Sequence, residues 1–338
     1  MNNKIDNSIS VIIPLLGSTE HTTKLILSLR EQSIQPDEII FIISMCGNWQ
    51  KTIELIEMEK TLNLTFFLVP KLFPGAARNY GAKLARSNWI AFLDIQTIPR
   101  ENWLESMLYL TEHESKSVNL VVAAMQCSAV NYFQRLLKAA TFGNKLVSCL
   151  PGSIVRRHVF IASGGFLENV RAGEDWEWLN RFKFDETRKN AAKAVVSYEG
   201  LPIRLGLLAS KWFKYSFENS KVDILLKEKF SYMGLAFLIF AVLLYRWNHL
   251  VSGEQWNEQA LLFIPNINKI FWSTFLSSYL VFRGIYKPLL NKENTYFLFP
   301  FSWLLIGFLG LFIDFIKAPG RIYGSLKYSV LKISSNFR

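Results

Sequence analysis

The residues best suited to chemistry surround one short predicted helix. Arg78 and Asn79 lie near the start of this Ala-rich helix, Ala76–Arg86, which follows a Gly-containing turn. A short apolar strand, Trp89–Leu93, comes next and leads directly to the carboxylate of Asp94. An Arg-Asn pair at a helix start, beside an acid at the carboxyl end of a strand, is suited to holding a phosphorylated ligand.

The elements that must position these residues alternate along about the first 200 residues. Strands are predicted at Ser10–Leu15, Glu38–Ser44, Leu64–Val69, Trp89–Leu93, Val118–Met125, Gly152–Arg156 and Ala194–Tyr198. Helices are predicted at Thr22–Gln32, Trp49–Leu62, Ala76–Arg86, Trp103–His113, Tyr132–Thr141 and Glu174–Phe184, with another near His158. Continuously apolar strands separated by helices indicate a parallel sheet covered on both faces. The sequence therefore predicts an α/β fold with a mostly parallel sheet flanked by helices.

The character of the chain changes near residue 230. The 338 residues carry a formal net charge of +11, and the mean hydropathy is +0.17. Basic residues flank the apolar region that begins there, at Lys211, Lys214, Lys221, Lys227 and Lys229 before it and at Lys317, Arg321, Lys327, Lys332 and Arg338 after it. Basic flanks beside apolar runs indicate contact with an anionic membrane surface. Because no basic face is interleaved with aromatic residues, we expect membrane lipids and no nucleic acid as a partner.

Three apolar segments lie between these basic flanks. Phe230–Tyr245 has 16 residues without a charge, Tyr296–Ile313 has 18, and Ala260–Phe282 is interrupted by a proline and a lysine. A spanning helix needs about 20 apolar residues, so we expect membrane helices near 230–247, 260–284 and 296–316. Core helices of a soluble domain are the alternative. Three full crossings would send the basic tail outside, so a segment that lies in the interface is a further alternative.

The cysteines and the N-terminus bear on the compartment. Cys46, Cys127 and Cys149 have neither CxxC spacing nor a His partner at metal-ligand distance, which fits a reducing compartment. The N-terminal sequence MNNKIDNSIS is polar and lacks the apolar core of a secretory signal. We therefore expect the N-terminal domain to face the cytoplasm.

Five segments, taken in order, carry a resemblance to a known family. They are SVIIP, PGAARNYGA, IAFLDIQTIPRENWLE, GGFLE and AGEDWEWLNR. This pattern, over about residues 8–200, resembles glycosyltransferase family 2, whose members have the GT-A nucleotide-diphospho-sugar fold. The resemblance implies transfer of a sugar from a nucleotide-sugar donor to an acceptor hydroxyl, with inversion at the anomeric carbon.

The resemblance also suggests which residues would catalyse the transfer. Asp175 would be the general base and Glu174 its companion, with helix capping as the alternative for both. Asp94 stands where the metal-binding D-x-D of the family begins, which implies a magnesium or manganese ion. Gln96 replaces the second acid, and its amide oxygen is a weaker ligand for such an ion.

The donor side follows from the same resemblance. Arg78 and Asn79 would approach the diphosphate or ribose of the donor, with a surface salt bridge as the alternative for Arg78. Pro14 shapes the end of the first strand, where backbone groups of the family meet the nucleotide base. Ser44 stands where the family usually has acids that contact the base or ribose, so the identity of the base stays open.

The acceptor side, by resemblance, consists of Gly164, Gly165, Phe166, Trp176 and Arg181. The two glycines would let the backbone approach the sugar or acceptor, and Phe166 would lie beneath the acceptor. Trp176 and Trp178 would stack on a sugar face, with core packing as the alternative. Arg181 would pair with Asp175 or with a phosphate.

The expected organisation has four parts. A GT-A catalytic domain over 1–204 is followed by a basic-aromatic juxtamembrane segment over 205–229, membrane helices over 230–316 and a basic amphipathic tail over 317–338. The expected protein is a membrane-anchored inverting glycosyltransferase of the inner membrane. Its acceptor would be lipid-linked or a surface polysaccharide.

Two other functions are alternatives to this one. Loss of acids at Ser44 and Gln96 would suit a catalytically degenerate protein that acts as an assembly factor in glycan biosynthesis or export. A processive polysaccharide synthase usually carries a Q-x-x-R-W signature, and this chain has only Ala209-Ser210-Lys211-Trp212 in that neighbourhood. Processive synthesis is therefore disfavoured.

Overall fold

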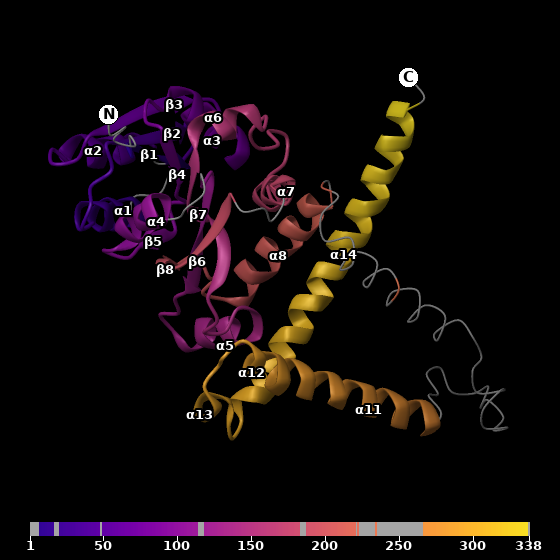
Figure 1. Cartoon of the computed structure of the whole chain (residues 1–338). Coiled ribbons are helices and arrows are strands. Elements are labelled where there is room, and N and C mark those ends of the chain that lie inside the picture. The colour runs from indigo at the N-terminus through magenta and orange to yellow at the C-terminus, as the bar shows by residue number, and fades with distance from the viewer. Residues whose placement is uncertain are drawn as a thin grey trace. The chain divides into compact units, whose positions relative to one another are not determined.

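A computed structural model describes residues 7–16, 20–47, 49–113, 118–182, 187–220, 222, 234 and 266–336 (Figure 1). The chain divides into two compact units. The first unit comprises Met1–Val130 and Asn144–Leu201, and the second comprises Asn131–Gly143 and Pro202–Arg338. Helix α5 (Tyr132–Thr141) therefore belongs to the second unit, although it lies within the sequence range expected for the catalytic domain.

An eight-stranded sheet organises the first unit, in the order β3-β2-β1-β4-β7-β6-β8-β5. The strands are β1 (Ile9–Leu15), β2 (Glu38–Ser44), β3 (Leu64–Val69), β4 (Trp89–Phe92), β5 (Thr97–Pro99), β6 (Leu120–Cys127), β7 (Val147–Arg156) and β8 (Arg188–Tyr198). Strands β1 to β4 pair in parallel, whereas β7 is antiparallel to β4 and β6. Strand β8 is parallel to β6 and antiparallel to β5. The predicted α/β class is confirmed, and the parallel arrangement applies to the first half of the sheet.

Helices cover both faces of this sheet. Helices α1 (Glu20–Arg30), α2 (Trp49–Met58) and α4 (Trp103–His113) contribute to one core cluster, and α3 (Pro74–Leu84), α6 (Arg157–Ala162) and α7 (Glu174–Arg181) contribute to the other. Because successive side chains of a strand point to opposite faces, Val11 and Ile13 of β1 join the first cluster while Ile12 joins the second. The second cluster includes residues of α3 and α7, the helices that carry the predicted site residues Arg78 and Asp175.

The differences from the predicted elements have physical causes. Helix α3 begins at Pro74, because proline is well tolerated in the first turn of a helix. Strands β7 and β8 begin several residues earlier than predicted, since their first halves are incompletely buried and lack a continuous apolar run. Strand β5 has only three residues, too few for any periodic signal.

The second unit is helical in its described residues. Its elements are α5, α8 (Leu205–Asn219), α11 (Asn266–Val281), the π-helix η1 (Phe282–Tyr286), α12 (Lys287–Leu290), α13 (Thr295–Leu298) and α14 (Ser302–Asn336). The long helix α14, yellow in Figure 1, contacts α5, α8, α11 and η1. It continues through Pro319 to Asn336, so residues 302–316 of the third expected apolar segment and residues 317–336 of the expected tail form one helix.

The expectation of several membrane helices has limited support. Except for Gly234, the expected segment near 230–247 lies outside the described residues. Among the residues described, Ser302–Lys327 of α14 is the one stretch long and apolar enough to cross a membrane, with 26 residues and a mean hydropathy of 1.5. Helices in the core of soluble proteins pass the same test. A multi-pass arrangement therefore finds no support in the described part of the chain.

Candidate active site

A buried arginine joins the two acidic segments that the sequence marked. Arg78 of α3 is 4% exposed. Its Nη2 donates to Asp94 Oδ1 at 2.5 Å, and its Nη1 donates to Glu174 Oε1 at 2.8 Å. One guanidinium therefore connects the end of β4 with the start of α7, across 80 residues of sequence from Asp94 to Glu174.

Local backbone structure presents both acids. The Asp94 amide donates to Thr97 Oγ1, and the Thr97 amide donates back to the Asp94 carbonyl, each at 2.9 Å. This turn closes the end of β4 and leaves the Asp94 side chain 38% exposed. Gly173 precedes α7 with φ of 90°, a left-handed conformation that glycine adopts without strain. Glu174 is buried and Asp175 is half-buried at the start of the helix.

The environment shifts the pKa values of Arg78, Glu174 and Asp175. Burial raises the pKa of Glu174 to about 7, although Arg78 opposes the shift. Burial also raises the pKa of Asp175, with Arg78 opposing and Asp94 adding to the shift. Burial alone would lower the pKa of Arg78, but the Asp94 and Glu174 charges outweigh it and raise that pKa. A carboxylate with a raised pKa accepts a proton more readily at neutral pH.

The side chain of Asn79 is hydrogen-bonded to the loop that follows Gly164 and Gly165. Its side-chain amide donates to the Phe166 carbonyl at 2.9 Å and to Glu168 Oε1 at 3.0 Å, and its Oδ1 accepts from the Phe166 amide at 2.8 Å. Gly165 has φ of +69°, and a Cβ placed there would lie 2.5 Å from Asn79 Oδ1. The Gly-Gly loop therefore requires glycine both for its conformation and for its close approach to α3.

Arg181 supports the same loop from α7. Its Nη1 donates to the Ser163 carbonyl at 2.7 Å, its Nη2 donates to the Gly165 carbonyl, and its Nε pairs with Glu177 Oε1 at 2.9 Å. The side chains of Asn79 and Arg181 thus both form hydrogen bonds with this loop. Both residues position the loop on which the predicted acceptor side depends.

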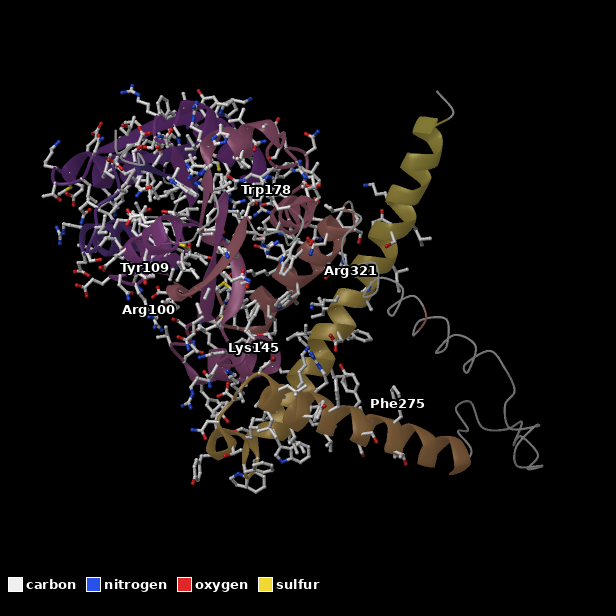
Figure 2. All side chains as sticks on the ribbon, in the orientation of Figure 1. Arg100, Tyr109, Lys145, Trp178, Phe275 and Arg321 are labelled. Atoms are coloured by element: carbon white, nitrogen blue, oxygen red, sulfur yellow. The ribbon has the colours of Figure 1, made fainter. Side chains whose placement is uncertain are left out.

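The aromatic residues of this region fall into two groups. Phe166 and Trp178 are buried and pack with Phe92 and Phe160 at ring-centroid distances of 5.0–5.4 Å. Trp178, labelled in Figure 2, also donates its indole N–H to Ser163 Oγ. These side chains form the support under the loop and α7. By contrast, Trp176 is 50% exposed and available for stacking on a ligand.

The remaining predicted donor residues lie at the carboxyl ends of neighbouring strands. Pro14 of β1 is paired in register with Ile42 of β2. Ser44 at the end of β2 is buried, and its Oγ accepts a long hydrogen bond of 3.4 Å from the Leu72 amide. The side-chain oxygen of Gln96 lies against Gly200, where an added Cβ would come within 2.3 Å of it. Gln96 is thus directed toward the β5–β8 end of the site.

Sequence reasoning missed one residue of this site. The side chain of Cys149 on β7 is half-buried, and its thiol donates to the Pro151 carbonyl at 3.0 Å. Burial raises the pKa of this thiol, and the charges of Asp94 and Asp175 add to the shift. The charges of Asp94 and Asp175 therefore act on the Cys149 thiol. Its sequence neighbourhood offers no spacing that marks it.

The side chains of this site can hold a divalent cation only together with oxygen atoms of a bound substrate. No cluster of three His, Cys, Asp or Glu side chains suited to a metal exists among the described residues. Asp94 is partly exposed and offers a carboxylate, although Arg78 already occupies one of its oxygens. Magnesium is commonly held by one or two carboxylates together with substrate phosphates, so the residues present fit that arrangement.

Comparisons with known proteins identify the class. Residues 10–161 match the family model described as Glycosyl transferase family 2. A protein of Rickettsia bellii (strain RML369-C), named an uncharacterized glycosyltransferase, is 26% identical over 181 residues, which cover 50% of this chain and 25% of that protein. The amylovoran biosynthesis glycosyltransferase AmsB of Erwinia amylovora is 31% identical over 110 residues, which cover 32% of this chain and 36% of AmsB. Over residues 10–161 the chain is thus similar to glycosyltransferase family 2, the family that its sequence resembles.

The matched segments cover only part of each relative. The matches to the two proteins cover well under two thirds of either relative's own length. Among solved structures, S. aureus TarS 1-349 in complex with UDP-GlcNAc has a TM-score of 0.46 and 15% identity, covering 95% of this chain and 91% of TarS. A likeness at that TM-score does not establish a shared substrate. The predicted resemblance to glycosyltransferase family 2 is confirmed for residues 10–161.

Proposed function

We propose that this protein is an inverting glycosyltransferase that moves a sugar from a nucleotide-diphosphate donor to a lipid-linked or surface-polysaccharide acceptor hydroxyl. The observation that carries the proposal is the double ion pair of Arg78. It brings the acid that follows β4 and the acids that open α7 to one place. An inverting transfer needs a proton acceptor on one side of the sugar and a neutralised leaving group on the other.

The proposed reaction is a single displacement. The acceptor oxygen forms a bond to the anomeric carbon as the bond from that carbon to the diphosphate oxygen breaks. The acceptor proton passes to the carboxylate of Asp175, and the nucleoside diphosphate leaves with the bonding electrons. The raised pKa of Asp175 favours this proton transfer at neutral pH.

Charge balance supports a cation on the donor side. Asp94, Glu174 and Asp175 bring three carboxylates to one guanidinium, Arg78, a formal excess of two negative charges when all are ionised. A diphosphate would be repelled by such a site unless a proton or a cation compensated it. When bound at Asp94, a divalent ion would neutralise the leaving diphosphate. Arg78 and Asn79 position the acids and the loop, and Trp176 would stack on the sugar or acceptor.

We also propose that the enzyme acts at the cytoplasmic side of the inner membrane and is anchored through α14. The candidate span Ser302–Lys327 and the basic residues around it support this placement. An amphiphilic acceptor stays in the bilayer, so tethering the enzyme there raises the effective concentration of the two partners. The named role of AmsB in amylovoran biosynthesis makes a polysaccharide pathway a reasonable acceptor source.

The test is turnover of the full chain, in detergent with magnesium or manganese, on a panel of UDP-, GDP-, CDP- and dTDP-sugars. Asp175→Asn should lower kcat by about 10²- to 10⁴-fold, which is the usual contribution of a general base. Glu57→Gln, which removes an exposed acid of α2, is the matched control and should retain full turnover. Equal turnover by Asp175→Asn and the parent would exclude Asp175 as the base.

A catalytically degenerate assembly factor is the second candidate. The replacement of family acids by Ser44 and Gln96 favours it. Absence of hydrolysis or transfer by the parent protein on every donor, with donor binding retained, would support this alternative.

A further inference from the structure

Helices α8 and α14 of the second unit pack unusually close together. A Cβ at Gly320 of α14 would lie 2.9 Å from the Phe213 carbonyl, and one at Gly324 would lie 2.8 Å from the Ser220 side chain. The Phe217 and Tyr323 rings stack across the contact at 5.6 Å between centroids. Small residues spaced four apart allow such close helix contacts. The two helices therefore present one continuous surface.

Four lysines of these helices carry positive charge near the contact: Lys211 and Lys214 of α8, and Lys317 and Lys327 of α14. Three lysines hold their ammonium groups over aromatic rings of α8. The distances from nitrogen to ring centroid are 4.7 Å for Lys317 over Trp212, and 5.6 Å both for Lys211 over Tyr215 and for Lys327 over Phe217. Arg321, labelled on α14 in Figure 2, is only 4% exposed and therefore does not belong to this surface.

Apolar side chains on the same helices face outward. Phe213 of α8 is exposed, as are Phe315, Tyr323 and Leu326 of α14, and Phe315 is 77% exposed. Lysines that lie over aromatic rings beside exposed apolar side chains form the amphipathic pattern of a membrane-interface helix, with apolar groups entering the bilayer and ammonium groups at headgroup depth. Lysine is depleted in the cores of protein–protein interfaces, which argues against a protein partner at this surface.

We propose that this basic-aromatic surface, made by Lys211, Lys214, Lys317 and Lys327 of α8 and α14, binds the phosphate-bearing headgroups of anionic phospholipids. The proposal deepens the membrane placement proposed above, but it does not depend on the transfer chemistry. Opposite charge supplies the attraction, and the adjacent apolar side chains supply the partition into the bilayer.

The test uses the full chain in mixed micelles of a neutral detergent, so that insertion of α14 does not itself produce the signal. Energy transfer from protein tryptophan to dansyl-labelled phosphatidylserine is compared with transfer to dansyl-labelled phosphatidylcholine. The apparent Kd for the anionic lipid should be at least about tenfold lower, since each cation near an anionic surface contributes about fivefold. The preference should weaken as salt is raised.

A variant with four neutralised lysines, K211Q/K214Q/K317Q/K327Q, should lose the preference for the anionic lipid. The control K51Q/K60Q/K83Q/K193Q removes the same charge from exposed lysines of the first unit and should retain it. Equal binding of the two lipids by the parent, or an equal loss in both variants, would overturn the proposal. Binding of a soluble polyanion without any lipid preference would overturn it as well, in favour of another anionic partner. Nucleotide-sugar turnover, measured in parallel, separates this outcome from a failure of the proposed reaction.

Discussion

Each unit of this protein contains a buried arginine that joins segments far apart in the sequence. Arg78 in the first unit is 4% exposed, and Arg283 in the second is 5% exposed. Arg283 lies in the π-helix η1, where its Nε pairs with Asp314 Oδ2 of α14 at 3.3 Å and its Nη2 donates to the Gly310 carbonyl at 3.2 Å. Each arginine thus connects separate segments of its own unit through ion pairs.

The charge around the two arginines differs. Arg283 faces one carboxylate, which also accepts from the Tyr279 hydroxyl, so positive and negative charges balance within the contact. Arg78 faces two carboxylates with Asp175 nearby, and it leaves an excess of negative charge beside a partly exposed acid. A balanced buried pair suits a helix contact, whereas an unbalanced cluster calls for a proton or a ligand. Burial alone therefore does not distinguish a structural arginine from one in a functional site.

The largest effect should come from removing each arginine. Arg78→Ala leaves Glu174 buried without its cation, which should lower the free energy of unfolding by about 3–5 kcal/mol and abolish transfer. Arg283→Ala should lower stability by a similar amount while donor turnover per folded molecule stays unchanged. Thermal unfolding of the full chain in detergent, together with nucleotide-sugar turnover, separates the two. Full activity in a folded Arg78→Ala protein would remove the basis of the comparison.

Arg78→Lys is the informative control for that experiment. An ammonium group keeps the charge but lacks the planar guanidinium that reaches two carboxylates at once. It should recover part of the stability and little of the turnover. Full recovery of turnover would mean that charge alone, and not the bridge between Asp94 and Glu174, matters.

A smaller effect concerns pH. The folded-state pKa of Glu174, about 7, lies above its unfolded value of about 4.5, so the folded state binds more protons between these values. The stability from this group is present below pH 4.5 and is lost as pH rises through 7. Relative to Glu174→Gln, the wild type should lose about 2–3 kcal/mol between pH 5 and 8, as measured by urea denaturation. A pH-independent difference between the two proteins would contradict the shift.

The next effect compares Gly165, which lies against Asn79 in the first unit, with Gly310, which lies against Arg283 in the second. Gly165→Ala places a side chain 2.5 Å from Asn79 Oδ1 at a φ of +69°, which should cost about 1–3 kcal/mol and displace the loop. We expect kcat/KM to fall by about 10- to 100-fold, since small misplacements in a site are costly. Gly310→Ala meets Arg283 Nε at 2.6 Å and should reduce stability without reducing kcat/KM. Equal losses of kcat/KM in both variants would mean that Gly165 acts only through general stability.

The sequence predicted the parallel half of the sheet and the acids of the site more fully than it predicted how they are held. Strands β2 and β3 appear at their predicted bounds, because apolar residues dominate each of them. The contacts of Asn79 and Arg181 with the Gly-Gly loop could not be read from sequence, because they join residues 87 and 16 positions apart through backbone carbonyls. The proximity of Cys149 to these acids could not be predicted either, because only folding brings β7 near Asp94 and Asp175.

The smallest expected effect falls on the exposed tryptophan of α7. Because Trp176 is half exposed whereas Trp178 is fully buried, only Trp176 is free to stack on a sugar. Trp176→Ala should raise KM for the donor or acceptor by about 2- to 10-fold, corresponding to ~0.5–1.5 kcal/mol of aromatic contact, with stability nearly unchanged. Tyr109→Ala removes an exposed aromatic from α4 and should leave KM unaltered. Steady-state kinetics on both variants checks this, and an unchanged KM in Trp176→Ala would leave the aromatic of α7 without a role in binding.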